Sequence, residues 1–234
     1  MSNAQQPPVV WISGASRGIG RAIALMLGRD GGRIVVNYRQ DAEAAQAVAA
    51  EITAAGGEAL TLQADVTDPE AITAAYKQIE AAWGGVDQLV ANAGINLAMP
   101  IPLMSPEAWR NVLATNLDSA FYLTKAVSRG MVRRRSGRIV YLSSDAALMG
   151  DALHAAYSAS KAGILGLART AARELAPSGV TVNVVSPGPI ETDMTAALPE
   201  ARRERQCAAI PMARFGRPEE VAGVVRFLLS DAAA

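Results

Sequence analysis

The sequence is poor in the residues that build disulfides and metal centres. Its 234 residues include one cysteine, Cys207, and one histidine, His154. A single cysteine excludes an internal disulfide, which is typical of proteins kept in a reducing cytoplasm. Because metal sites in proteins draw on clusters of ligands, we expect no bound metal. We interpret His154 as a partly exposed structural residue, with a place at a substrate mouth as the alternative, and Cys207 as incidental.

An excess of one charge and long apolar runs are also missing. The 22 basic and 22 acidic residues balance, so global charge favours neither nucleic acid nor a membrane surface as partner. No apolar run reaches the ~18 residues of a membrane helix, and no secretory signal opens the chain. We therefore expect a cytoplasmic protein.

Hydrophobic residues, in contrast, make up half of the chain. Short β-branched runs alternate with longer Ala-rich stretches, and the runs are nearly all apolar, which indicates strands buried on both faces. We predict strands at 9–13, 33–38, 59–64, 87–91, 138–143 and 181–186. We predict helices at about 18–29, 41–56, 69–83, 105–131, 154–176 and 218–230.

This alternation predicts right-handed βαβ crossovers and a parallel sheet covered on both faces. We expect one α/β domain of the doubly wound, Rossmann-like type over 9–234, in three layers, after a flexible N-terminus at 1–8. Helix starts are predicted at three Pro-containing sites, Asp68-Pro69, Ser105-Pro106 and Arg217-Pro218. The Pro-rich stretch 188–216 has little periodicity and predicts a substrate lid.

A glycine-rich loop joins the first predicted strand to the first helix. It reads Ser13-Gly14-Ala15-Ser16-Arg17-Gly18-Ile19-Gly20. Glycines let the backbone approach a pyrophosphate, and the helix N-terminus offers free N–H groups. A tight turn with close helix packing is the alternative, but this position in the fold favours dinucleotide binding.

The end of the second strand indicates which dinucleotide. An acid there usually binds the ribose 2′-hydroxyl of NAD, whereas an arginine accommodates the 2′-phosphate of NADP. The segment Asn37-Tyr38-Arg39 has no acid before Asp41, and Arg17 lies in the glycine loop. The alternative is that both arginines are solvated surface residues, but together they favour NADP(H).

Acid–base chemistry is indicated by Tyr157 and Lys161, which are four residues apart on one face of a predicted helix. A free tyrosine has a pKa near ~10, and a close ammonium lowers it. Ser144 follows the fifth strand, where ligands collect in open α/β sheets. An ordinary amphipathic pair is the alternative for Tyr157 and Lys161 alone. The combination predicts proton donation to a carbonyl oxygen.

The ordered motifs resemble those of the short-chain dehydrogenase/reductase family, and the match runs from about residue 9 to 230. They are Gly14-x3-Gly18-Ile19-Gly20, Asn92-Ala93-Gly94, Ser144, Tyr157-Ser158-Ala159-Ser160-Lys161 and Pro187-Gly188. The resemblance implies a catalytic tetrad. Asn116 would hold a water through its backbone, Ser144 would polarise the carbonyl, and Tyr157 would be the acid. Lys161 would bind the nicotinamide ribose and lower the pKa of Tyr157.

The resemblance also implies further coenzyme contacts. Asp65 and Val66 would lie against the adenine, and Asn92, Ala93 and Gly94 would shape its ribose side. The nicotinamide would be walled in by Pro187, Gly188, Ile190 and Thr192. If the family resemblance is set aside, the alternative interpretation of Asn116 is a capped or bent helix, and that of Asn92 is stabilisation of a turn.

Two departures from the family stand out. Ala91 replaces a common asparagine, which we expect to be a mild change. The chain ends at 231–234, where family members usually continue into a seventh strand, so we expect a truncated chain rather than a six-stranded enzyme.

Within the family, several stretches most resemble bacterial 3-oxoacyl-[acyl-carrier-protein] reductases. They lie at 125–127, 133–140, 159–163, 188–194 and 214–222. The resemblance implies NADPH-dependent reduction of a 3-oxoacyl thioester in fatty-acid or related polyketide-type biosynthesis. Acetoacetyl-CoA reductases and sugar or alcohol dehydrogenases share these stretches and are the alternatives. A non-catalytic NADP(H)-sensing regulator is the alternative from another class.

Surface residues suggest possible partners. A basic cluster near one helix end comprises Arg129, Arg133, Arg134, Arg135 and Arg138. Such cations stabilise helix C-termini by ~0.3–1 kcal/mol each; the sharper interpretation is docking of an acidic acyl carrier protein. We assign carrier docking to Arg129 and Arg135. The resemblance places Arg135 at a docking position, whereas the second such position holds Ser178, which weakens this prediction.

Two further predictions concern apolar surface. An acyl pocket, or alternatively generic packing, would use Met99, Met104, Met194 and Met212. By resemblance, the helices at 105–131 and 154–176 would pack two-fold into a homodimer or homotetramer.

Overall fold

A computed structural model describes residues 6–234, so the part of the expected flexible terminus before residue 6 lies outside the described residues. Six parallel strands form one sheet in the order β3-β2-β1-β4-β5-β6. They are β1 (Val9–Ile12), β2 (Arg33–Tyr38), β3 (Glu58–Gln63), β4 (Gln88–Ala91), β5 (Gly137–Leu142) and β6 (Val180–Val185). All six predicted strands are confirmed, with ends that differ by at most one residue.

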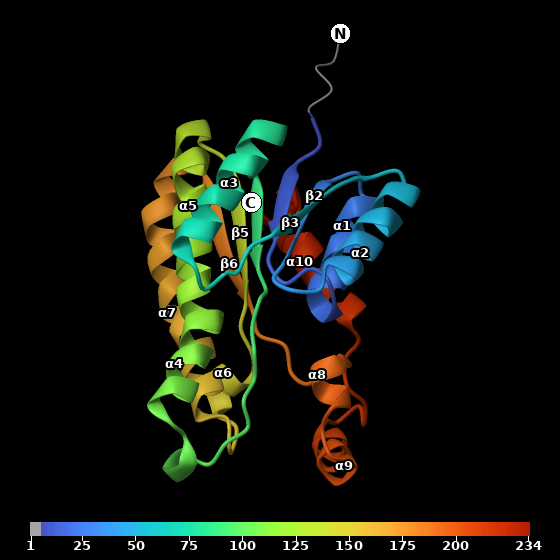
Figure 1. The fold of residues 1–234 in the computed structure, drawn as a ribbon, viewed down its shortest axis with the longest axis vertical. Helices are drawn as coiled ribbons and strands as arrows, with labels where there is room; N and C mark the ends of the chain where they lie inside the picture. Colours follow the sequence, from blue (N-terminus) through green and yellow to red (C-terminus); the bar gives the residue numbers. More distant parts are fainter. Residues whose placement is uncertain (1–5) are drawn as a thin grey trace.

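Helices cover both faces of this sheet, as predicted (Figure 1). One face carries α3 (Pro69–Trp83), α5 (Ser119–Arg134) and α7 (Ala155–Leu175), and the other carries α1 (Gly18–Arg29), α2 (Ala42–Ala54) and α10 (Pro218–Leu229). Alternate residues of β1 serve the two cores: Trp11 packs on the first side and Ile12 on the second. The chain is therefore a three-layer, doubly wound α/β domain.

The edge strands are less buried than predicted. β3 and β6 each have only one buried residue, whereas β1 is buried throughout. The prediction of burial on both faces is wrong for these two strands, because each has a hydrogen-bonded neighbour on one side only within the described sheet.

The three predicted Pro-containing helix starts are confirmed. The Asp68 carboxylate accepts hydrogen bonds from the first turn of α3, at 2.8 and 3.2 Å. Ser105 Oγ accepts from Ala108 N at 3.1 Å and so caps α4 (Pro106–Leu113). At the start of α10, Glu220 accepts from the Arg217 backbone N–H at 2.7 Å.

The predicted helix at 105–131 is interrupted and longer. A π-helical turn, η2 (Ala114–Asp118), separates α4 from α5, and α5 continues to Arg134. It ends there because Arg135 adopts a left-handed backbone with φ of 54°. π-Turns frequently occur at functional sites, and this one contains the buried residue Asn116.

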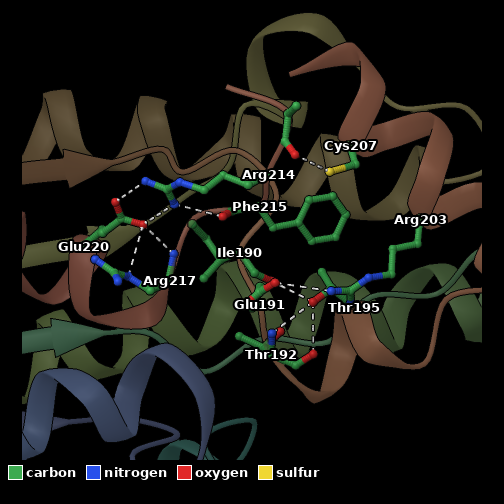
Figure 2. Close-up of polar contacts among 11 residues, drawn as sticks. Ile190, Glu191, Thr192, Thr195, Arg203, Cys207, Arg214, Phe215, Arg217 and Glu220 are labelled. Carbon is green, nitrogen blue, oxygen red and sulfur yellow. Dashed lines mark hydrogen bonds and ion pairs between the residues drawn. The ribbon is translucent and has the colours of Figure 1, made fainter. Parts of the chain in front are cut away.

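The stretch 188–216 forms two short helices, α8 (Asp193–Ala196) and α9 (Glu200–Ala209), rather than an aperiodic loop. They extend beyond the carboxyl ends of the strands, across a gap from α4 and α6 (Ala146–Met149) in Figure 1. The two ends of this excursion meet, because Ile190 pairs with Gly216. Figure 2 shows Arg214 forming two hydrogen bonds to Glu220, at 2.8 and 2.7 Å, which fix the returning end to α10.

Helix α9 is tied to both the core and its own excursion. Arg202 Nη2 lies 3.5 Å from the Asp151 carboxylate and 3.2 Å from His154 Nδ1. Arg203 pairs with Glu191 at 3.2 Å, as Figure 2 shows. The prediction of a partly exposed His154 is wrong: the side chain is buried, with 2% relative exposure, and bonded to the loop before α7.

Residues 6–234 contain no helix long and apolar enough to cross a membrane. In the same range, no cluster of three or more His, Cys, Asp or Glu residues is arranged to hold a metal ion. Cys207, in α9, is a free thiol whose Sγ donates to the Ala213 carbonyl at 3.0 Å.

Candidate active site

The chain reverses its direction of travel across the sheet between β1 and β4, and ligands of open α/β folds collect at this position. A cleft of about 650 Å³ lies at the carboxyl ends of these strands. Most of the predicted coenzyme residues line it, namely Gly14, Ser16, Arg17, Gly18, Ile19, Arg39, Asp65, Val66, Asn92, Ala93, Gly94 and Thr192. Residues from the first half of the chain and from the 188–216 excursion thus share one cleft.

The glycine loop can take its shape only without side chains. Gly14 and Gly18 have φ of 64° and 55°, a region that favours glycine. A Cβ on Gly20 would collide with the Gly14 carbonyl oxygen and lie 2.6 Å from Asn92 Nδ2. Gly20, predicted as a coenzyme residue, is therefore buried beneath the loop and lets α1 approach it.

Ser13 and Asn92 fasten the ends of β1 and β4 to each other. Ser13 Oγ accepts from the backbone N–H groups of Asn92 and Ala93, both at 3.0 Å. Asn92 Nδ2 donates to the carbonyls of Ser13 and Gly14, at 3.0 and 3.1 Å. The sequence prediction missed Ser13; its signal was a polar residue at the end of an otherwise apolar strand.

Two arginines stand at the rim of the cleft. Arg17 Nη1 lies 3.8 Å from the Asp193 carboxylate, and Arg39 Nη1 lies 3.9 Å from that of Asp65. Both side chains are more than half exposed. The first acid after β2, Asp41, accepts from Ala44 N at 2.9 Å and caps α2. The rim therefore offers cations where NAD enzymes usually hold an acid.

Lys161 carries a buried ammonium behind the lining of the cleft. Its Nζ donates to the Leu142 carbonyl at 2.7 Å, and burial lowers the pKa of Lys161 to about 8. A Cβ on Gly94, which lines the cleft, would lie 3.4 Å from this Nζ. The ammonium thus reaches the wall of the coenzyme cleft.

Tyr157 lies beside Lys161 on α7, with the ammonium 5.7 Å from the ring centroid. Burial raises the pKa of Tyr157; the Ser144 hydroxyl opposes this, and the Asp145 and Asp151 carboxylates add to it. Lys161 is not among the groups that shift this pKa, because its ammonium is directed to the Leu142 carbonyl. The phenol therefore keeps its proton at neutral pH.

Ser144 follows β5 as predicted, but its hydroxyl is engaged. Its Oγ donates to Asp145 Oδ1 at 2.9 Å and accepts from Ala146 N at 3.2 Å. The sequence prediction did not single out Asp145, although a carboxylate directly after Ser144 was visible. This acid controls where the Ser144 proton points.

Asn116 binds two neighbouring segments through its side chain. Its Oδ1 accepts from Ile95 N at 2.8 Å, and its Nδ2 donates to Ile95 O and to Ser160 Oγ, both at 3.0 Å. The π-turn thereby fixes the loop after β4 against α7. Because the side chain is engaged with Ile95 and Ser160, the predicted water would have to be held through the Asn116 backbone.

The predicted nicotinamide wall lies beside Ser144 rather than in the lining of the cleft. The Pro187 carbonyl accepts from Asp145 N at 3.0 Å, and a Cβ on Gly188 would lie 3.5 Å from Asp145 Oδ2. Ile190 packs against Gly216. Of this predicted group, only Thr192 lines the cleft itself.

The predicted docking arginines lie far from Ser144. Arg135 precedes β5 and Ser144 follows it, so the length of that strand separates them. Arg135 Nη2 donates to the Pro177 carbonyl at 3.0 Å, and Arg129 lines a groove of about 600 Å³ formed by α3 and α5. The other arginines of the cluster pair with acids: Arg133 with Glu80, Arg134 with Asp87 and Arg138 with Asp231.

Comparison with known proteins shows the family of the chain. The sequence profile of the family described as "short chain dehydrogenase" matches residues 8–203. A 3-oxoacyl-[acyl-carrier-protein] reductase from Synechocystis sp. is 47% identical over 226 residues, which cover 97% of this chain and 90% of the relative. The enzyme of the same name from Staphylococcus aureus is 43% identical over 222 residues, covering 95% and 90%. The chain belongs to the short-chain dehydrogenase family and is an oxidoreductase acting on ketone or hydroxyl groups.

Proposed function

We propose that this protein reduces 3-oxoacyl thioesters to 3-hydroxyacyl thioesters with NADPH. One observation carries the proposal: the Lys161 ammonium lies 5.7 Å from the Tyr157 ring and also reaches Gly94 at the wall of the glycine-lined cleft. This arrangement joins an acid–base pair to a dinucleotide site. The names of the relatives from Synechocystis sp. and Staphylococcus aureus support the same reaction.

The cleft fits the coenzyme chemically. The loop at Gly14 and Gly18 exposes a backbone cradle that a Cβ on Gly20 would disrupt, which suits a pyrophosphate. Arg17 and Arg39 would hold the 2′-phosphate, because a guanidinium forms forked hydrogen bonds to phosphate oxygens. NADPH, when bound, supplies the hydride for the ketone carbon.

Side chains of this protein would supply the proton. Charge develops on the substrate oxygen as the ketone is reduced, and a positioned donor stabilises it. We assign the donation to Tyr157 Oη, whose raised pKa keeps the proton in place until then. Ser144 would bond the same oxygen, and Lys161 would bind the nicotinamide ribose at the cleft wall.

An apolar rim favours an acyl chain over a sugar. Exposed side chains flank the site on the loop before α4, on α6 and in the 188–216 excursion: Ile101, Leu103, Leu148, Met149, Met194 and Met212. The loop before α4 meets the loop after α6, since Met99 N donates to the Leu153 carbonyl at 2.7 Å. Contiguous exposed apolar surface marks a binding site for apolar groups. Of the predicted acyl-pocket methionines, Met194 and Met212 belong to this rim.

An acyl carrier protein is the proposed physiological donor of the substrate. Arg129 and Arg135 would bind its acidic surface. The six residues of β5 separate Arg135 from Ser144, a distance of about 20 Å at strand geometry. The thioester arm of the carrier would have to span this distance.

Three further features belong to the proposal. The stretch 188–216 would act as a substrate lid over the rim. The chain would form a homodimer or homotetramer by two-fold packing of α5 and α7, where Phe121 is half exposed. The reaction would take place in a reducing cytoplasm, in keeping with the single cysteine.

The test follows NADPH oxidation with an acetoacetyl thioester, a carrier-bound 3-oxoacyl thioester and a panel of sugars. We expect turnover of both thioesters and faster turnover of the carrier-bound one. Activity with sugars alone would overturn the substrate assignment. NADPH binding without turnover of any substrate would favour the sensing regulator.

A further inference from the structure

Asp145 is a carboxylate without a cationic partner beside the proposed proton donor. Its Oδ1 accepts from Ser144 Oγ at 2.9 Å and from Ala146 N at 2.8 Å. Within residues 6–234, no Lys, Arg or His side chain forms an ion pair with it. Its negative charge is therefore uncompensated by any neighbouring cation of the described chain.

The other charged groups around Tyr157 are already paired. Asp151, from the loop before α7, lies 3.0 Å from His154 Nδ1 and 3.5 Å from Arg202 on α9. The Lys161 ammonium, on α7 itself, donates to the Leu142 carbonyl at the end of β5. Of the two carboxylates that raise the pKa of Tyr157, Asp145 is thus the one without an ion-pair partner within residues 6–234.

The Ser144 hydroxyl has a single proton, and two groups compete for it. In the structure the proton points to Asp145 Oδ1 at 2.9 Å. A phenolate at Tyr157 would be stabilised by the same proton, since the Ser144 hydroxyl favours the ionised phenol. Asp145 therefore disfavours the phenolate twice, by repulsion and by holding the Ser144 proton.

We propose that Asp145 is a positioning residue for the reduction: before substrate binds, it holds the Ser144 hydroxyl proton away from Tyr157 and so keeps the Tyr157 proton available for the substrate oxygen. When substrate binds, the Ser144 hydroxyl turns from Asp145 to the substrate oxygen. The inference rests on the proposed function, since it assigns that proton to the substrate. Neither Asp145 nor Ser144 gives up or gains a proton in this arrangement. The competing interpretation is that Asp145 only caps the four-residue helix α6 through Ala146 N.

The first test compares pH profiles of the wild type and Asp145→Asn. Reduction needs the phenol, so kcat/KM falls as pH rises through the pKa of Tyr157. Removing the charge should move this alkaline limb to lower pH, by on the order of 1 pH unit. Asp145→Glu keeps the charge and should restore the wild-type limb. If Asp145→Asn fails to fold, Asp145→Ser supplies a neutral cap in its place.

Asp151→Asn is the matched control. It also removes a carboxylate near Tyr157, but one whose charge His154 and Arg202 already offset. We expect a smaller shift of the limb in this variant. A limb that stays in place in Asp145→Asn, or that moves equally in both variants, would overturn the inference; a capping role alone would lower stability without moving the limb.

A second readout needs neither substrate nor turnover. NMR of isotopically labelled tyrosine follows the ionisation of each phenol, and Tyr157→Phe identifies the resonance of Tyr157. The titration of Tyr157 should move to lower pH in Asp145→Asn, and by less when Ser144→Ala is also present, because part of the effect passes through the serine proton. An unchanged titration would refute the inference. Failure of the wild type to reduce any thioester would refute only the proposed function.

Discussion

The Lys161 side chain places an ammonium where water cannot solvate it. Burial lowers its pKa from 10.5 to about 8. Between these values the unfolded chain binds a proton that the folded chain does not, so the free energy of unfolding rises with pH across this window. At about 1.4 kcal/mol per pKa unit, the rise is about 3 kcal/mol.

Lys161→Met should abolish this rise, because the substituted side chain does not titrate. Urea denaturation at several pH values from 8 to 10.5 measures it. A variant whose stability still increases by the wild-type amount would show that the ammonium is not the group responsible.

The rim arginines predict coenzyme choice. Arg17→Ala and Arg39→Ala each remove a cation from the cleft edge. We expect each to raise the KM for NADPH about tenfold, equivalent to ~1.4 kcal/mol, and to leave the KM for NADH nearly unchanged. Arg29→Ala, at the other end of α1, serves as the control. Equal losses for both coenzymes would argue against recognition of the 2′-phosphate.

At the scale of single elements, features that depend on neighbouring residues could be predicted, whereas features that depend on distant residues could not. The Pro-containing starts at Asp68, Ser105 and Arg217 were found because their capping chemistry is local. The π-turn at Asn116 was not, since it depends on the bonds of that side chain to Ile95 and Ser160, which lie far away in sequence. The uneven burial of β3 and β6 likewise depends on strand order.

Two glycine-to-alanine substitutions should have opposite effects, one in the turn from β1 into α1 and one inside α10. Gly20→Ala brings a Cβ against Gly14 and within 2.6 Å of Asn92. We expect a loss of about 1–3 kcal/mol of stability and weaker NADPH binding.

Gly223→Ala is the matched control, inside helix α10, where a Cβ would meet nothing within 4 Å. It should stabilise the protein by about 0.5–1 kcal/mol, because alanine is the better helix former. Thermal unfolding and coenzyme titration compare the two. If Gly20→Ala kept wild-type stability and NADPH binding, the claim that a Cβ at this position collides with the glycine loop would be wrong.

At the scale of the whole molecule, the sequence predicted the layers, the strand alternation and most of the cleft lining. These follow from periodicity and from motifs at strand ends. The burial of His154 was mispredicted because Arg202, which lies 48 positions away, covers it. The net direction of the Tyr157 pKa could not be predicted for the same kind of reason, since it depends on burial and on two carboxylates from other segments.

The central claim is that the Tyr157 phenol and the glycine-lined cleft serve one reaction. Tyr157→Phe tests it most directly, with NADPH affinity and reduction of an acetoacetyl thioester measured on the same protein. The account predicts unchanged NADPH affinity and a loss of reduction of roughly 10²–10⁴-fold, the usual contribution of a positioned acid. A variant that still reduces the thioester at the wild-type rate would contradict it.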